Sequence, residues 1–191
     1  MQQGFTCSKA YTSLFTYHHQ HTTIIILIYV DDIVITGSSH TAIDQLVQSM
    51  SEVFAIKDLG PLTNFLGIEV QYSNNGLLLH QSKYAAEILH KAGMTQCKGA
   101  TTPAVPKSTA KPDLADIPYA SPTRFRSIVG ALQYLTLTRP DLQQSVNSIC
   151  QNMHSPTQQS YSALKRLLRY VQNTISSGLQ FTVGPHVLNG F

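Results

Sequence analysis

Apolar positions follow two different rhythms along the chain, and the change between them divides it. In the first third, apolar residues form short continuous runs, whereas later they recur every three or four positions. The runs Ile24–Val30 and Ile33–Thr36 are rich in β-branched residues, which predicts two strands. The adjacent Asp31 and Asp32 between them are interpreted as the tight connection of a hairpin embedded in buried apolar surroundings. The first part of the chain is therefore expected to contain a sheet.

One helix and a second hairpin are predicted next. Apolar residues at helical spacing between Ile43 and Phe54 follow the segment Gly37–Ser39, which offers an N-cap. The stretch Phe65–Tyr72 predicts a further strand. Asn74–Gly76 supplies residues that favour left-handed turns, and Leu77–Gln81 is then the returning strand.

From Ser82 onward the pattern becomes helical. Ser82 is a candidate N-cap for a helix that Gly93 ends. Further helix starts are predicted at Ser121-Pro122, at Thr138–Asp141 and at Ser155–Gln158, where Gln158 is placed for a capping box. Residues 97–113 lack apolar rhythm and predict a long loop, and 178–191 predict a partial strand or hairpin. Strands with one helix followed by a run of helices indicate an α+β fold.

Charge is scarce and unevenly distributed. Charged residues make up 12% of the 191 positions, about half the usual share, so part of the surface is expected to be an interface. Residues 1–82 carry two Lys/Arg and six Asp/Glu, whereas residues 83–191 carry eleven and four. The basic second part suits the phosphate backbone of a nucleic acid, although on charge alone a solvated basic face is the simpler explanation.

Cysteine usage and hydropathy suggest where the protein works. Cys7, Cys97 and Cys150 lie far apart, which argues against a disulfide framework and against a zinc site. The apolar run Ile24–Val30 is too short to span a bilayer, and the N-terminus does not resemble a secretory signal. We expect an intracellular, cytoplasmic protein that is not secreted and does not contact a membrane.

The pair Asp31-Asp32 is the most informative chemical feature. Two ionised carboxylates at contact distance repel each other, so each requires solvent or a cation. A solvated turn is one interpretation. The other is a hard divalent cation such as Mg²⁺, which in proteins takes one or two carboxylates together with substrate phosphates, as in two-metal phosphoryl transfer.

The sequence around this pair resembles a known family. "YVDD" at Tyr29–Asp32, in a strand–turn–strand context, resembles the catalytic hairpin of reverse transcriptases. The ordered segments "SLF", "LIYVDDIVITGSS", "FAIKDLGPLTNFLGIEV", "GLLLHQSKYAAEIL", "KGATTP", "RSIVGALQYLTLTRPD", "SPT" and "ALKRLLRYVQNT" together look like the polymerase of copia-type LTR retrotransposons. The likeness covers nearly the whole chain.

The resemblance implies an organisation and a function. Residues 1–81 would be the C-terminal part of a polymerase palm, 82–177 a helical thumb and connection, and 178–191 the start of an RNase H-like region. The family is an RNA-directed DNA polymerase, which transfers nucleotides with two Mg²⁺ ions inside virus-like particles. Its partners are dNTPs and an RNA or DNA template–primer duplex. The fingers and the upstream palm, and the RNase H domain downstream, would lie outside this chain.

The resemblance also assigns roles at the hairpin. Asp31 would bind metal and Asp32 would support the metal site. Tyr29 and Val30 would lie beside the primer terminus and the incoming nucleotide. Lys57 would match a lysine that protonates the leaving pyrophosphate.

Nucleic-acid contacts are implied further along. Phe65, Leu66, Gly67 and Ile68 would form the primer grip, with Gly67 permitting close backbone approach. Packing in the core is the competing interpretation for Phe65 and Leu66. Six basic residues are candidates for phosphate contacts, and solvated helix faces are the alternative: Lys83, Arg124, Arg126, Lys165, Arg166 and Arg169.

The chain also departs from the family pattern. Such polymerases use three carboxylates, yet no acidic residue precedes Asp31, and Tyr11 stands where the family commonly has Asp. We therefore expect poorly held Mg²⁺ and negligible polymerase activity from this chain alone. The alternatives are a non-catalytic nucleic-acid-binding remnant of a degenerate retroelement and a decaying insertion without function. A nucleotide cyclase could also use a carboxylate hairpin, but the ordered motifs favour the polymerase.

Overall fold

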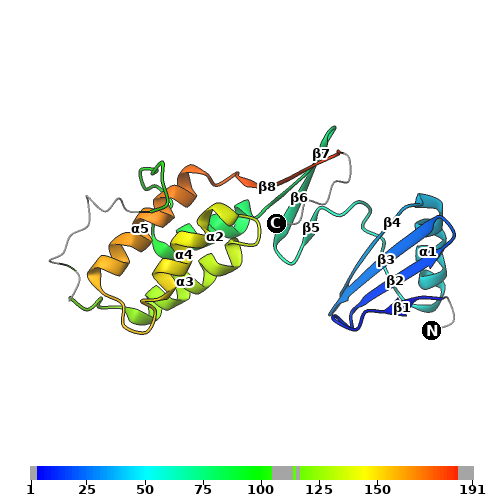
Figure 1. Ribbon diagram of the computed structural model, residues 1–191, viewed down its shortest axis with the longest axis horizontal. Helices are drawn as coiled ribbons and strands as arrows, with labels where there is room; N and C mark the ends of the chain where they lie inside the picture. The colour runs from blue at the N-terminus through cyan, green and yellow to red at the C-terminus, as the bar shows by residue number, and fades with distance from the viewer. Residues whose placement is uncertain (1–3, 105–113, 115–116, 185–191) are drawn as a thin grey trace. The chain divides into compact units, whose positions relative to one another are not determined.

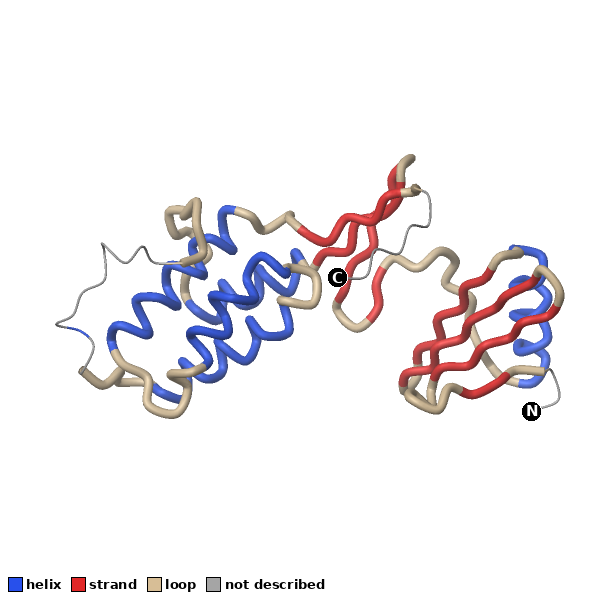
Figure 2. The backbone as a smooth tube through the Cα atoms, in the orientation of Figure 1, coloured by secondary structure: helices blue, strands red, loops and turns tan. Residues whose placement is uncertain are grey.

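The computed structural model describes residues 4–104, 114 and 117–184 and has an α+β fold, as expected. Two compact units divide the chain between Leu62 and Thr63. Each contains one four-stranded antiparallel sheet. Figure 1 labels the elements, and Figure 2 separates helices from strands by colour.

The first unit is a sheet covered by one helix. Its strands lie in sequence order and are antiparallel: β1 Thr6–Cys7, β2 Leu14–His19, β3 Thr22–Tyr29 and β4 Asp32–Gly37. The helix α1, His40–Val53, lies along one face of this sheet (Figure 1). Ile24 and Ile26 of β3 and Leu46 of α1 are buried together. Alternate residues of β3 therefore bury against α1, because successive side chains of a strand point to opposite faces.

The start of α1 agrees with the sequence prediction. Ser39 is the N-cap, and its hydroxyl accepts a hydrogen bond from the Ala42 backbone N–H at 3.3 Å. This bond satisfies one of the donors that the first helical turn leaves without an intrahelical partner. The turn that joins β4 to α1 thus fixes where the helix begins on the sheet.

The sheet of the second unit combines strands from both of its ends. Its strands are β5 Asn64–Phe65, β6 Ile68–Ser73, β7 Gly76–His80 and β8 Gly178–Thr182, paired in that order. The prediction of one strand over Phe65–Tyr72 was wrong, because Leu66 and Gly67 form a turn between β5 and β6. A partial strand or hairpin was expected over 178–191, and within it Gly178–Thr182 forms a strand that pairs with β7. The assignment of 178–191 to an RNase H-like region remains a prediction, and 185–191 lie outside the described residues.

The helices of the second unit share one core. They are α2 Ser82–Ala92, α3 Pro122–Leu135, the 3₁₀ helix η3 Pro140–Leu142, α4 Gln143–Cys150 and α5 Gln158–Asn173. The apolar stripes predicted from the sequence face inward. The largest fully buried apolar side chains of this core are Leu89, Phe125, Leu132, Leu135, Leu142, Leu164, Leu167 and Leu168.

Helix ends differ in detail from the predictions. Gly93 ends α2 in the left-handed conformation, with φ of 67°, as predicted. The N-cap of α2 is Gln81 rather than Ser82, which is already helical. The capping box of α5 joins Thr157 to Ser160 and does not use Gln158. The cause is the same in both cases, because the helix boundary lies one or two residues from the expected one.

No helix in the described part of the chain is both long enough and apolar enough to cross a membrane. The predicted loop 97–113 is described up to residue 104, and the remainder lies outside the described residues.

Candidate functional site

The hairpin that carries the paired carboxylates has its turn at Val30-Asp31. Tyr29 pairs with Asp32 across the end of β3 and β4. The prediction that Asp31 and Asp32 form the two-residue connection was therefore off by one position. Val30 has a φ of 52°, a left-handed conformation that is unusual for a β-branched residue. The turn thus places the two carboxylates differently, with Asp31 in the turn and Asp32 opening β4.

The tip of this hairpin is exposed, which contradicts the expectation of buried apolar surroundings. Val30 is 82% exposed and Tyr29 43%. Ile28 and Ile33, the next cross-strand pair, are also exposed. The reason is that α1 covers the sheet at Ile24 and Ile26, and the hairpin extends past the residues that pack on this helix.

Tyr29 and Asp32 lie on the sheet face opposite α1. Directly paired residues of an antiparallel ladder share a face, and successive residues alternate. Ile24 and Ile26 face α1, so Tyr29 and its partner Asp32 face the other way. The pairing therefore brings one aromatic ring and one carboxylate to the same face of the hairpin tip.

Two carboxylates form only part of a metal site. Asp31 and Asp32 are exposed and supply the hard oxygen ligands that Mg²⁺ prefers. Among the described residues, no group of three or more His, Cys, Asp or Glu could hold a metal ion. A magnesium ion at this hairpin would therefore need its other ligands from water, phosphate or another segment.

Lys57 is exposed and lies in the segment that follows α1 in the sequence. In the described part of the first unit, no hydrogen bond or ion pair joins it to Asp31 or Asp32. The next residue, Asp58, accepts a hydrogen bond from Gly60 N–H at 2.8 Å, and Gly60 has a φ of 75°. A local turn thus fixes the backbone beside Lys57, and the role of Lys57 as a general acid remains a prediction.

The segment Phe65–Ile68 forms a two-residue hairpin turn. Phe65 pairs with Ile68, while Leu66 and Gly67 have φ of 51° and 74°. Two left-handed residues in succession are typical of a type I′ turn. A side chain added at Gly67 would meet nothing within 4 Å, so within this chain the glycine serves the backbone conformation. A close approach by a primer remains a prediction.

A tyrosine from α3 contacts this turn. The Tyr134 hydroxyl donates a hydrogen bond to the carbonyl oxygen of Leu66. The Tyr84 ring of α2 meets the Tyr134 ring edge-on, with centroids 5.4 Å apart. Tyr84 also packs against the helical core.

Two of the basic residues predicted to bind phosphate hold a backbone segment. Arg166 donates from Nε to the Ala104 carbonyl and from Nη2 to Thr102 Oγ1, both at 2.6 Å. Arg169 Nε donates to the Lys98 carbonyl, also at 2.6 Å. These bonds fasten residues 98–104, which we call the strap, along α5. They also occupy donors that a phosphate would need.

The other four candidates have intramolecular contacts as well. Arg124 donates to the Ala92 carbonyl at 3.0 Å and so satisfies the end of α2. Arg126 Nη1 lies 3.5 Å from the Met153 carbonyl oxygen. The ammonium of Lys165 lies 5.1 Å from the Tyr161 ring centroid, within reach of a cation–π contact. The ammonium of Lys83 lies 3.5 Å from Glu69 Oε2 and is largely exposed.

Glu69 stabilises the start of α2. Its Oε1 accepts a hydrogen bond from the Lys83 backbone N–H at 3.1 Å and lies 3.6 Å from His80 Nδ1. Partial burial raises the pKa of this carboxyl, but the Lys83 hydrogen bonds and the charges of His80 and Lys83 outweigh it, so the pKa lies below its usual value. An anion at a helix N-terminus is also favoured by the helix dipole.

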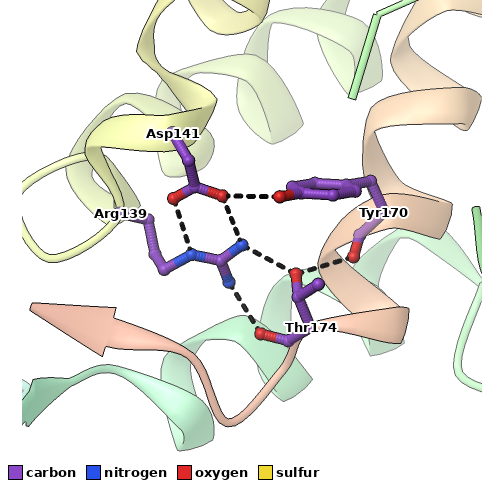
Figure 3. Close-up of polar contacts among 4 residues, drawn as sticks. All are labelled: Arg139, Asp141, Tyr170 and Thr174. Atoms are coloured by element: carbon purple, nitrogen blue, oxygen red, sulfur yellow. Dashed lines mark hydrogen bonds and ion pairs between the residues drawn. The ribbon is translucent and has the colours of Figure 1, made fainter. Parts of the chain in front are cut away.

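Sequence reasoning missed a buried polar cluster around Arg139, shown in Figure 3. Its side chain is 3% exposed and forms a two-point ion pair with Asp141, at 2.9 Å from Nε and 2.8 Å from Nη2. Nη1 donates to the Thr174 carbonyl at 2.8 Å, and the Tyr170 hydroxyl donates to Asp141 Oδ2 at 3.0 Å. The hydrogen bonds from Arg139 lower the pKa of Asp141, and burial together with the bond to Asp141 raises the pKa of Tyr170.

Comparison with known proteins identifies the family. A family model described as reverse transcriptase (RNA-dependent DNA polymerase) matches residues 1–106. The chain is 40% identical, over 92% of its length, to the retrovirus-related Pol polyprotein from transposon RE1 of Arabidopsis thaliana. It is 31% identical, over 88% of its length, to that from transposon TNT 1-94 of Nicotiana tabacum. The chain therefore belongs to the reverse transcriptase family of copia-type retrotransposons.

The relatives differ greatly in length from this chain. An uncharacterised mitochondrial protein of Arabidopsis thaliana, AtMg00810, is 51% identical over 81% of the chain and 63% of its own length. The chain spans 12% of the RE1 polyprotein and 13% of the TNT 1-94 polyprotein. No solved structure matches the chain.

Proposed function

We propose that this chain is part of an RNA-directed DNA polymerase, with Asp31 and Asp32 at its nucleotidyl-transfer site. The observation that carries the proposal is the hairpin in which Tyr29 pairs with Asp32 and two adjacent carboxylates stand at an exposed tip, in a chain of the reverse transcriptase family. Its partners would be dNTPs and an RNA or DNA template–primer duplex. Residues 1–81 would serve as palm, 82–177 as thumb and connection, and 178–191 as the start of an RNase H-like region.

The residues at the tip have separate roles in this proposal. Asp31, in the turn, binds a magnesium ion, and Asp32 completes the chain's share of its ligands. When bound, Mg²⁺ offsets the charge of the phosphates and favours the attacking hydroxyl in its ionised form. Tyr29, on the same face as Asp32, packs beside the primer terminus, and Val30 lies beside the incoming nucleotide. Lys57 supplies a proton to the leaving pyrophosphate.

We expect negligible polymerase activity from the chain alone. Two carboxylates hold a metal pair poorly, and the lost electrostatic stabilisation of the transition state costs several kcal/mol, or several orders of magnitude in rate. A primer-extension assay that compares this chain with Asp31→Asn tests that expectation. Extension by the unchanged chain and none by the variant would contradict the expected inactivity while supporting the role of Asp31.

Metal binding can be tested without activity. In nuclear magnetic resonance spectra, Mn²⁺ should broaden the backbone signals of Val30–Ile33 first, and Asp31→Asn should reduce this broadening. Asp44→Asn is the matched control, because Asp44 is an exposed carboxylate on α1 in the same unit. Broadening that persists in Asp31→Asn, or that centres away from the hairpin, would contradict the proposed metal site.

A non-catalytic nucleic-acid-binding role is the second candidate. The charge of the second part of the chain favours it, since residues 83–191 carry eleven Lys/Arg and four Asp/Glu. Under this alternative, primer–template binding falls with added salt and does not depend on Mg²⁺ or on Asp31. The polymerase proposal instead predicts that Mg²⁺ strengthens primer–template binding in the presence of a dNTP and that Asp31→Asn abolishes the gain.

A further inference from the structure

We propose that Tyr134 is a positioning residue, which fixes the β5–β6 turn, Phe65–Ile68, on the helices of the same unit. The inference rests on the proposed function, because it gives this turn a primer end to hold. Tyr134 lies in the last turn of α3, and its hydroxyl donates to the carbonyl oxygen of Leu66. This hydrogen bond thus joins two residues that lie 68 positions apart in the sequence.

The turn needs such an anchor because its own strands hold it weakly. β5 has two residues, so its ladder with β6 contains two residue pairs, Asn64 with Glu69 and Phe65 with Ile68. Short edge strands with few ladder bonds open easily. In addition, Leu66 is held in a left-handed conformation, with φ of 51°, which is unfavourable for a residue other than glycine. Contacts from outside the hairpin must therefore contribute to holding this geometry.

Tyr134 is itself well oriented to supply that contact. Its ring meets the Tyr84 ring at 88°, with centroids 5.4 Å apart, an edge-on arrangement that aromatic pairs favour. The neighbouring Leu135 and Leu132 of α3 are fully buried in the helical core. α2 and α3 thus set the position of the phenol, and its hydrogen bond to the Leu66 carbonyl fixes the turn relative to these helices.

Part of the surface of the turn is not covered by the rest of the chain. Leu66 is 39% exposed, and a side chain placed at Gly67 would meet nothing within 4 Å. An extended sugar–phosphate chain could therefore approach the turn backbone without a clash from this chain. Tyr134 holds the turn at the Leu66 carbonyl, and so would set where a bound primer end lies relative to α2 and α3.

Tyr134→Phe in the 191-residue chain removes the hydroxyl and keeps the ring. Tyr84→Phe is the matched control, since it removes a hydroxyl from the other ring of the same pair. Without nucleic acid, hydrogen exchange of the amides in Asn64–Ser73 should be about fivefold faster in Tyr134→Phe, the effect of one ordinary hydrogen bond. Exchange in this segment should be unchanged in Tyr84→Phe. Equal exchange in the unchanged chain and Tyr134→Phe would overturn the inference.

A second measurement tests whether the primer 3′ end lies at the turn and whether Tyr134 sets its position. A primer–template duplex with 4-thiothymidine at the primer 3′ end is irradiated, and the cross-linked peptide is identified. The unchanged chain and Tyr84→Phe should cross-link within Thr63–Ser73. Tyr134→Phe should lose most of this cross-link at unchanged overall affinity and unchanged Tm, which a merely structural role would not produce.

The outcomes separate the two proposals. A cross-link that stays undiminished in Tyr134→Phe would overturn the positioning role while leaving the proposed function standing. A cross-link from the unchanged chain that falls elsewhere would overturn the primer-grip role of the turn. In that case the primer-positioning role fails too, even if hydrogen exchange shows that Tyr134 anchors the turn.

Discussion

Arg139 and Asp141 form a two-point ion pair on either side of Pro140. Through bonds to Tyr170 and Thr174, this pair joins η3 to the end of α5. The Arg139 side chain is 3% exposed, whereas that of Asp141 is 40% exposed. The guanidinium also donates to the carbonyl and the hydroxyl of Thr174, which caps the C-terminal end of α5. A buried charge requires partners of this kind, and here they come from segments 35 residues apart.

Removing Arg139 should therefore destabilise the second unit strongly. Arg139→Met keeps most of the side-chain volume but removes the guanidinium donor of the Thr174 carbonyl and leaves the Asp141 carboxylate with the Tyr170 hydroxyl in place of its ion pair. We expect a loss of about 3 kcal/mol in the free energy of unfolding, measured by urea denaturation with a probe in the helices. Arg126→Met is the control, because Arg126 is exposed and its contact to Met153 is 3.5 Å long. Equal losses of unfolding free energy in both variants would show that the buried contacts of Arg139 do not stabilise the unit.

The same pair predicts a dependence of stability on pH. Hydrogen bonds from Arg139 hold the pKa of Asp141 below its usual value of 3.8. A carboxyl with a lowered folded-state pKa stabilises the fold above the unfolded-state pKa and loses this contribution as pH falls through the folded value. Unfolding free energy should thus decline below about pH 4. Asp141→Asn should flatten that decline, and should flatten it much less in an Arg139→Met background.

The sequence predicted the regular elements better than the turns, for a physical reason. The stripe containing Phe125, Leu132 and Leu135 repeats at helical spacing and is buried, and burial of one face is what creates such a pattern. Val30 and Leu66 adopt positive φ without being glycine, so neither residue type marked its turn, and only Gly67 indicated the second one. Strain of this kind depends on the surrounding fold rather than on local preference.

Long-range polar contacts were equally hidden from the sequence. Arg166 and Arg169 stand beside apolar residues of α5 and look like a solvated basic face. In the structure they reach the strap residues 98–104, more than 60 positions away. The acceptors of these two bonds are the backbone carbonyls of Ala104 and Lys98, and backbone acceptors leave no trace in residue identity.

Gly99 in the strap should not tolerate a side chain. A Cβ at this position would lie 2.6 Å from Asn173 Oδ1 and 2.9 Å from Asn173 Cβ. Gly99→Ala should therefore cost about 1–3 kcal/mol in unfolding free energy. Asn173→Ala removes Oδ1 but keeps the Cβ atom 2.9 Å away, so it should restore only part of this loss in the double variant. Gly130→Ala is the control of opposite sign. Its Cβ would meet nothing within 4 Å, so the added helix propensity should stabilise α3 by about 0.5–1 kcal/mol.

Val30 at the hairpin tip should be replaceable with a gain in stability. Its φ of 52° is unfavourable for a β-branched side chain, and its side chain is 82% exposed. Val30→Asn should stabilise the first unit by about 1 kcal/mol, read from slower hydrogen exchange in β3 and β4. Ile33→Asn, in the adjacent strand, should have the opposite effect, since β4 is extended and asparagine disfavours strands. A destabilising Val30→Asn would show that Val30 makes packing contacts that outweigh the backbone strain.

The basic residues of the second unit should separate into structural and nucleic-acid-binding groups. Arg169→Gln removes the bond to the Lys98 carbonyl and should lower Tm, because the strap loses an anchor on α5. Lys91→Gln changes an exposed lysine in the last turn of α2 and should leave Tm nearly unchanged. If exposed lysines provide the phosphate contacts, Lys91→Gln or Lys165→Gln should reduce the slope of log affinity against log salt for duplex by up to about 1. A smaller slope for Arg169→Gln at unchanged Tm would instead show that Arg169 contacts the nucleic acid. An arginine that holds the strap should lower Tm when it is replaced.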